Sequence, residues 1–157
     1  AIGNAVVDTL LADESVEAVF KFSRAEITEH DDKVKHIFID IEDEESIKQA
    51  TESLPEDTKF DLIFVATGIL HDEKNVFPEK SIKDISFDKL IKVLTINTIG
   101  PTLVGKYFIP YLRKDSKSTF AFLSARVGSI SDNKLGGWYS YRASKTALNQ
   151  ILSLIHI

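Results

Sequence analysis

The chain has 157 residues, of which 43% are hydrophobic and 27% charged, and this composition predicts one domain with a sizeable core. Its net charge of -5 argues against a general nucleic-acid binder. Cysteine is absent, which excludes disulfides and thiolate metal sites and favours a reducing, cytoplasmic location. No apolar run approaches the length of a membrane span. The four histidines lack the spacing of metal ligands: His30, His36, His71 and His156.

Helices and strands are expected to alternate along the chain. The expected elements are a helix over 3–12, strands over 16–22 and 34–40, a helix over 44–53 with Asp43 as its cap, a strand over 60–66, a long helix over 87–113, a strand over 119–124 and a final helix from Trp138. Such alternation predicts a doubly wound α/β fold with a parallel sheet.

Tyr141 and Lys145 are four residues apart in the final helix and therefore share one of its faces. An ammonium group in that position can stabilise a tyrosinate and lower the pKa of the phenol. Such a pair can protonate a carbonyl oxygen while a hydride arrives from a nicotinamide cofactor. The spacing also occurs by chance in solvated helices, so the surroundings matter. The preceding strand ends at Ser124, and a glycine-punctuated loop follows it, which is typical of an active site at a strand's carboxyl end.

The segments 124–130 and 141–149 resemble the short-chain dehydrogenase/reductase family. The long loop with two glycines before Trp138 is most similar to its C-factor and carbonyl-reductase-like branch. The resemblance implies a Rossmann-like sheet and hydride transfer between a small carbonyl or alcohol substrate and NADP, with NAD possible. It implies that Tyr141 is the general acid in reduction and that Lys145 lowers its pKa and binds the nicotinamide ribose. Asn97 would hold a water that relays protons to Lys145, whereas by itself a buried helical asparagine is more often structural.

The residues that the resemblance assigns to the cofactor follow the expected strand ends. They are Ile2, Gly3, Ser23, Arg24, Asp40, Ile41, Ala66, Thr67 and Gly68, together with Asn97, Tyr141 and Lys145. Arg24 favours NADP over NAD, because an arginine at this strand end accommodates a 2'-phosphate. Asp40 would contact adenine, although a turn or capping aspartate is an equal alternative. Val65 and Ala66 stand where the family has asparagines, so we expect those side-chain hydrogen bonds to be lost.

The serine that orients the substrate carbonyl in the family has no direct counterpart at the aligned position of this sequence. The usual second serine of the family pattern aligns with Ala125, and the first aligns with Ser124. Adjacent side chains of a strand point to opposite faces, so Ser124 replaces the missing serine only if the strand end shifts. Ser129 and Ser131 in the following loop are the alternatives.

The resemblance also bears on the limits of the chain. Residues 1–151 are expected to form a partial NAD(P)-binding Rossmann domain that lacks the first strand and the C-terminal strands, which leaves a slot in the sheet. Such a fragment is expected to be inactive by itself. Residues 152–157 are interpreted as a non-native tail, because a transposon-end sequence can encode them, and an ordinary apolar helix end is the alternative.

Two further expectations concern function and assembly. An NAD(P)-binding signalling or regulatory protein of the C-factor type, with little turnover, is the alternative to an enzyme. The long helix has apolar residues on more than one side, including Ile91, Val93, Ile99 and Val104. Together with the resemblance, this pattern predicts that the full-length protein is a homodimer or homotetramer that pairs the long helix and the Tyr141 helix. A thick core helix is the alternative.

Overall fold

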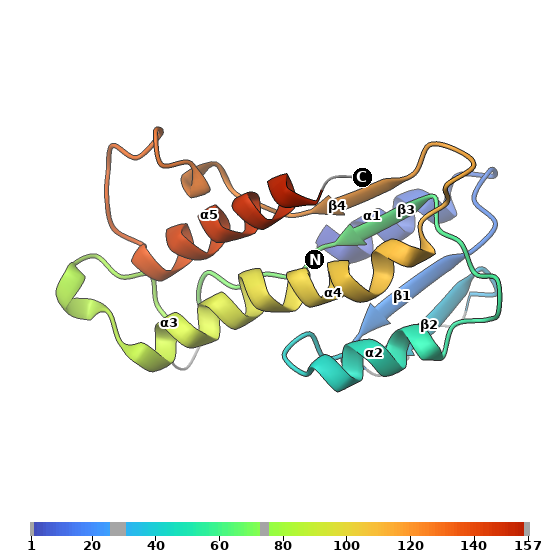
Figure 1. Cartoon of the computed structure of the whole chain (residues 1–157), viewed down its shortest axis with the longest axis horizontal. Coiled ribbons are helices and arrows are strands. Elements are labelled where there is room, and N and C mark those ends of the chain that lie inside the picture. The colour runs from blue at the N-terminus through green and yellow to red at the C-terminus, as the bar shows by residue number, and fades with distance from the viewer. Residues whose placement is uncertain (1, 26–30, 73–75, 156–157) are drawn as a thin grey trace.

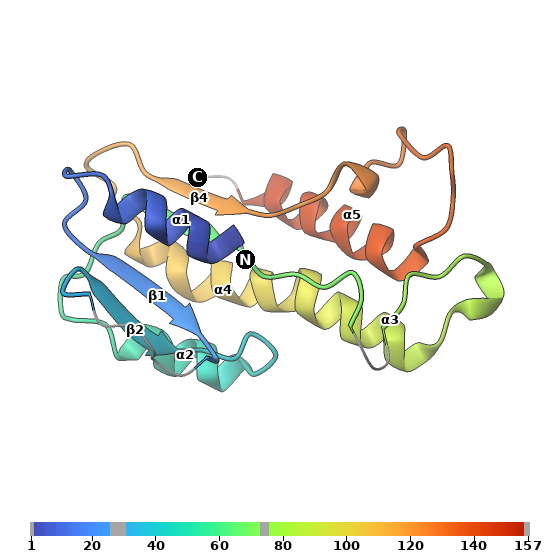
Figure 2. The same cartoon turned by 180° about the vertical axis from the view of Figure 1, so that it is seen from behind.

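A computed structural model describes residues 2–25, 31–72 and 76–155. Its strands form two parallel pairs: β1 (Val19–Ser23) with β2 (Val34–Phe38), and β3 (Leu62–Val65) with β4 (Thr119–Phe122). The α-helices are α1 (Ile2–Leu11), α2 (Glu44–Glu52), α3 (Phe87–Leu94), α4 (Gly100–Phe108) and α5 (Tyr139–Leu154). Helix α1 covers one face of the strands, and α2 and α4 cover the other (Figures 1 and 2). The predicted parallel α/β arrangement is therefore confirmed.

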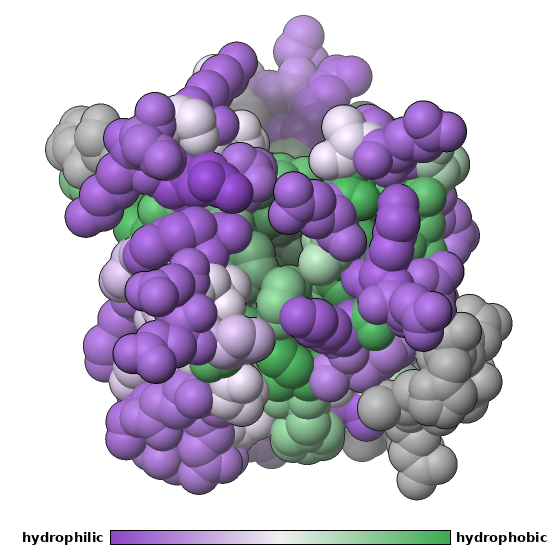
Figure 3. All heavy atoms as spheres, turned by 90° about the vertical axis from the view of Figure 1, so that its right-hand side faces the viewer, coloured by the Kyte–Doolittle hydropathy of each residue, from purple (hydrophilic) through white to green (hydrophobic). Residues whose placement is uncertain are grey.

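A slot divides the sheet between β1 and β3. Within the described ranges, no ladder joins these two strands, and each belongs to a separate two-stranded sheet. Two cavities of about 360 and 670 Å³ lie between them. The smaller is lined largely by apolar side chains of the strands and of α1, whereas polar and apolar residues of the strand starts and adjoining loops line the larger. The larger cavity lies where the strands begin. Figure 3 views this end of the molecule and shows a hollow with a mostly hydrophobic interior and mostly hydrophilic surroundings. The slot expected in the middle of the sheet is present.

Strands β1 and β2 are shorter than predicted because backbone N–H groups near their ends form hydrogen bonds outside the sheet. β1 begins at Val19, since Val16 N–H donates to Asp13 O in a turn. β2 ends at Phe38, and Asp40 N–H then donates to the hydroxyl of Ser46. Asp43 caps α2 as predicted, and its carboxylate accepts from Glu45 N–H at 3.0 Å.

The long helix is continuous from Phe87 to Tyr111 but is not regular. A π-helical turn, Thr95–Ile99, separates α3 from α4, and a 3-10 turn, Ile109–Tyr111, ends the run. A π turn contains one more residue than an α turn, and the apolar pattern of this segment did not reveal it. The predicted single α-helix over 87–113 is therefore wrong in its regularity and in its end.

The core lies between the strands and the pair α2 and α4. Its buried residues are Ile39, Ile47, Ala50, Ile63, Val65, Val104, Phe108 and Leu112. Helix α5 lies beside α3, where its buried residues include Leu148. It continues through Leu154, so residues 152–154 of the suspected tail extend the helix, whereas 156–157 lie outside the described residues.

Candidate active site

Asn97 lies at the centre of the π turn and is completely buried. Its Oδ1 accepts from Ile69 N–H at 2.7 Å, and its Nδ2 donates to Ile69 O at 2.8 Å and to Ser144 Oγ at 3.0 Å. The side chain thus joins the loop after β3 to helix α5. Because π turns move side chains off the regular helical phase, they are frequent at functional sites. The structural interpretation of Asn97 is supported, and its role in a proton relay stays a prediction.

Lys145 is buried in α5, at 3% exposure, with its ammonium group directed at the end of β4. Its Nζ donates to Leu123 O at 2.7 Å and lies 5.8 Å from the centre of the Tyr141 ring. Burial lowers the pKa of Lys145, because removal from water disfavours the charged ammonium. The pair expected from its four-residue spacing is therefore brought together, beside the carboxyl end of a strand.

Burial also raises the pKa of Tyr141, because a tyrosinate loses water contacts inside the protein. This direction is opposite to the lowering expected from Lys145. The physical reason is that the ammonium lies beside the ring face and is bound to a backbone carbonyl. In this arrangement Tyr141 retains its proton at neutral pH.

Gly68 brings the loop after β3 against these side chains. A Cβ atom added to this glycine would lie 3.3 Å from Nζ of Lys145 and 3.4 Å from Oδ1 of Asn97. The first distance is tighter than that of an ordinary Cβ contact and the second lies at its limit, so a larger residue would require Nζ of Lys145 to shift by a few tenths of an ångström. The absence of a side chain at Gly68 keeps the space next to Lys145 and Asn97 open.

Ser124, which follows β4, contacts α5 at a different level from Tyr141. Its hydroxyl donates to Asn149 Oδ1 at 2.6 Å. Asn149 is eight residues beyond Tyr141, which corresponds to about 12 Å along a helix axis. A role for Ser124 at the substrate carbonyl would therefore require its hydroxyl to leave Asn149. The alternatives, Ser129 and Ser131, lie in the adjacent loop with their hydroxyl oxygens 3.1 Å apart.

Sequence reasoning missed the buried carboxylate that holds the start of α5. Glu79 is 3% exposed, and its carboxylate accepts from the backbone N–H and the hydroxyl of Ser140. Its backbone carbonyl accepts from Trp138 N–H. Trp138 has φ 55° and ψ 43°, a left-handed conformation that is costly for a bulky residue. These contacts fix the first turn of the helix that carries Tyr141. Because Glu79 and Ser140 are separated by 61 positions in the sequence, no local pattern indicates their contact.

The residues assigned to the cofactor gather where β1, β2 and β3 end. A cavity of about 390 Å³ is lined there by Ser23, Arg24, Ile41, Ala66, Thr67 and Gly68, among others. Gly3, near the start of α1, lines the neighbouring 360 Å³ cavity with Ser23, Ala66 and Thr67. Ile2 begins α1 with an exposed side chain. Most of the predicted cofactor residues are therefore brought to one edge of the sheet.

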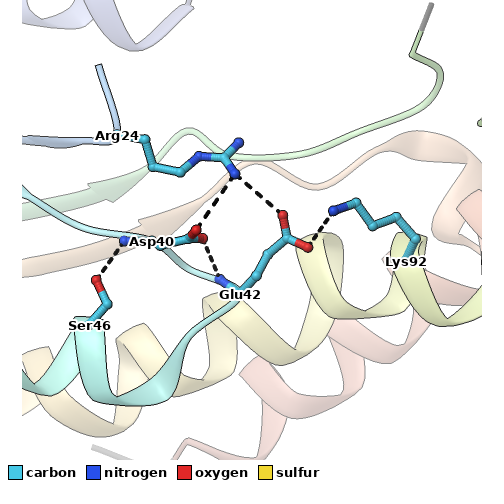
Figure 4. Close-up of polar contacts among 5 residues, drawn as sticks. All are labelled: Arg24, Asp40, Glu42, Ser46 and Lys92. Carbon is cyan, nitrogen blue, oxygen red and sulfur yellow. Dashed lines mark hydrogen bonds and ion pairs between the residues drawn. The ribbon is translucent and has the colours of Figure 1, made fainter. Parts of the chain in front are cut away.

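Arg24 and Asp40 belong to a charged group at this edge, drawn in Figure 4. Nη1 of Arg24 lies 3.8 Å from Oδ2 of Asp40 and 3.5 Å from Oε1 of Glu42. Oδ1 of Asp40 accepts from Glu42 N–H at 3.0 Å, so Asp40 forms a turn, as the alternative interpretation of this residue proposed. Glu42 also pairs with Lys92 of α3 at 2.6 Å. Neither Glu42 nor Lys92 was identified from the sequence.

Metal-ligating side chains do not assemble in groups of three or more within the described ranges. Two of the four histidines, His30 and His156, lie outside those ranges. No helix in the described part of the chain has the length and apolarity needed to cross a membrane.

Comparisons with solved structures agree with this architecture. The NADPH-bound carbonyl reductase from chicken fatty liver aligns with 96% of this chain and 67% of its own length, at a TM-score of 0.79 and 28% identity. Carbonyl reductase Sniffer of D. melanogaster covers 95% of this chain and 66% of its own length, at a TM-score of 0.77. At 21% identity, the second match shows the fold alone.

Comparisons of sequence define the family. The 1-hydroxy-2-glutathionyl-2-methyl-3-butene dehydrogenase of Rhodococcus sp. (strain AD45) is 30% identical over 114 residues, or 72% of this chain and 46% of the relative. The C-signal protein of Myxococcus xanthus is 36% identical over 69 residues, or 44% of this chain and 42% of the relative. The chain thus spans less than half the length of either. The family model described as short chain dehydrogenase matches residues 1–156, and the chain therefore belongs to the short-chain dehydrogenase family.

Proposed function

We propose that the protein is an NADP-dependent oxidoreductase that reduces a carbonyl group, or oxidises an alcohol, by hydride transfer. Tyr141 and Lys145 are the acid–base pair, and Asn97 supports them. The observation that carries the proposal is the convergence at Gly68, where the loop that borders the strand-end cavity meets Lys145 and Asn97. The dinucleotide-binding unit corresponds to residues 1–151, and residues 152–157 have no role in it.

The residues at the strand ends fit a nicotinamide dinucleotide. Gly68 leaves room that a Cβ atom would fill, between the cavity and Lys145. The ten-residue helix α1 begins at Ile2 beside the neighbouring cavity, and the free N–H groups of a helix N-terminus bind phosphate. Arg24 provides a guanidinium for a 2'-phosphate, and the chicken carbonyl reductase, which binds NADPH, supports the preference for NADP. When bound, the dinucleotide supplies or accepts the hydride.

The protein's own residues donate the proton and stabilise the resulting charge. The raised pKa keeps Tyr141 protonated, so its hydroxyl can donate a proton to the carbonyl oxygen as the hydride arrives. The nearby Lys145 ammonium then stabilises the tyrosinate that remains. Leu123 O holds that ammonium in place by accepting its hydrogen bond. A serine hydroxyl, Ser124 being the first candidate, would orient the carbonyl after release from Asn149.

The test is the substitution Tyr141→Phe, which removes the proton donor and keeps the ring. In the full-length protein, we expect NADPH oxidation with a panel of aldehydes, ketones and quinones to fall by about 10²–10⁴-fold, with NADPH affinity largely retained. Tyr139→Phe, two residues earlier in α5, is the matched control and should retain the parental rate. Near-normal turnover of the Tyr141→Phe protein would contradict the assigned role.

A dinucleotide-binding signalling or regulatory protein is the second candidate. Its support is the 36% identity to C-signal over 69 residues, together with Ala125 at the usual serine position and the Ser124 hydroxyl bound to Asn149. Such a protein would bind NADPH without oxidising it in the presence of any carbonyl compound of the panel. Turnover above the Tyr141→Phe background would exclude this alternative.

A further inference from the structure

We propose that Glu42 and Lys92 set the preference between dinucleotides with and without a 2'-phosphate, because Glu42 competes with that phosphate for Arg24. This inference rests on the proposed dinucleotide function and extends it to two residues outside the family resemblance. Figure 4 shows the arrangement: Arg24 reaches across from the end of β1 to Glu42, and Lys92 approaches Glu42 from α3 on the opposite side.

Arg24 is the loosely held member of this group. Its side chain is 62% exposed, and the distances of 3.5 and 3.8 Å from its guanidinium to the two carboxylates exceed those of charge-assisted hydrogen bonds. Exposed ion pairs of this kind contribute little to stability. An incoming phosphate, with which arginine makes strong bidentate hydrogen bonds, can therefore draw Arg24 away from both carboxylates.

Glu42, in contrast, is fixed at the wall of the cavity that Arg24 also lines. Its side chain is only 21% exposed, its backbone N–H donates to Asp40, and its Oε2 accepts from Lys92 Nζ at 2.6 Å. When Arg24 moves to a phosphate, this carboxylate stays close to the phosphate and repels it. A free 2'-hydroxyl meets no such repulsion, so Glu42 selects against the 2'-phosphate.

Lys92 limits that selection by occupying one oxygen of Glu42. The four side chains Arg24, Lys92, Asp40 and Glu42 together carry no net charge. Neutralising Glu42 frees Arg24 and leaves the group positive, which favours the 2'-phosphate. Removing the Lys92 ammonium releases Glu42 to pair more closely with Arg24, which disfavours binding of the 2'-phosphate. The two substitutions are therefore expected to act in opposite directions.

The experiment measures nucleotide binding by calorimetry and needs no turnover. The probes are adenosine 2',5'-bisphosphate and 5'-AMP, and the quantity compared is the ratio of their affinities. Glu42→Gln should raise the ratio in favour of the bisphosphate by roughly tenfold, and Lys92→Met should lower it by several-fold. Lys92→Arg, which retains the charge, should preserve the parental ratio. Glu45→Gln, a nearby glutamate that pairs with Lys48, is the matched control.

The double variant Glu42→Gln/Lys92→Met separates this mechanism from a general change in charge. If Lys92 acts through Glu42, the double variant keeps the raised ratio of Glu42→Gln. A return to the parental ratio would mean that the two charges act independently and would overturn the inference. Melting temperatures identify any variant that is unfolded. Glu42→Asp retains the charge, so its affinity ratio should stay below the ratio expected for Glu42→Gln.

The controls also distinguish failure of this inference from failure of the proposed function. If Arg24→Ala lowers the ratio while Glu42→Gln leaves it unchanged, the cofactor site stands and the role of Glu42 is refuted. If neither nucleotide binds the parental protein at millimolar concentration, the proposed dinucleotide function fails and this inference fails with it.

Discussion

Substitution of Asn97 by alanine tests whether this side chain holds the site together. The change removes three hydrogen bonds and leaves Ile69 N–H and Ile69 O without their partner. A buried polar group that loses its partner costs about 1–3 kcal/mol, and the half-buried Ile69 favours the low end of this range, so the two groups cost about 2–4 kcal/mol. Ser144 loses less, because its hydroxyl still donates to Tyr141 O. We therefore expect a loss of about 3 kcal/mol, a large share of the usual 5–15 kcal/mol.

Urea unfolding followed by circular dichroism and by Trp138 fluorescence measures this loss, provided that the slope of free energy against urea is unchanged. Asn149→Ala is the matched control, because this exposed asparagine has one hydrogen bond to Ser124 and should cost about 1 kcal/mol or less. A double-mutant cycle with Ser144→Ala should give a coupling of at least about 0.5 kcal/mol. A destabilisation by Asn97→Ala no larger than that of the control would refute this structural role of Asn97.

Three further predictions follow from the same site. In the cofactor-free protein, the 295 nm titration difference between the parent and Tyr141→Phe should appear above pH ~10. Because the folded-state pKa of Tyr141 is raised, the contribution of this residue to stability is present below the unfolded-state pKa and is lost as pH rises through the folded-state pKa. A titration of Tyr141 below pH ~10 would contradict the burial argument. Glu79→Ala should lower the melting temperature and slow turnover more than Glu79→Gln, whose amide oxygen can still accept from Ser140; equal effects would argue against the helix-capping role. Ile91 and Ile99 are 45% and 49% exposed on the long helix, so Ile99→Lys should convert the expected dimer or tetramer to a smaller species in light scattering, and a monomeric parent would contradict that interface.

Local sequence patterns predicted those parts of the molecule that depend on short-range geometry. The four-residue spacing of Tyr141 and Lys145 placed the pair on one helix face, and Asp43 identified the start of α2. Gly68 could be placed at a strand end because the apolar run before it is short and bounded. The assignment of these residues to catalysis or to the cofactor stays a prediction.

Long-range contacts account for most of what the sequence did not predict. The pairing of Glu42 with Lys92 spans 50 residues, and that of Glu79 with Ser140 spans 61. Burial raised the pKa of Tyr141, although adjacency in sequence suggested only the influence of Lys145. The direction of the Ser124 hydroxyl depends on Asn149, on a different element, and strand alternation alone could not reveal it.

The π turn at Thr95–Ile99 makes the length of this segment as important as its composition. A π turn accommodates one extra residue within a single helical turn, so deletion of one residue there would restore a regular helix without rotating the part beyond it. Val104 and Phe108 would then keep their places in the core, whereas Asn97 would lose the position from which it reaches Ile69 and Ser144. We therefore expect a one-codon deletion in this stretch to spare the fold and to disrupt the site.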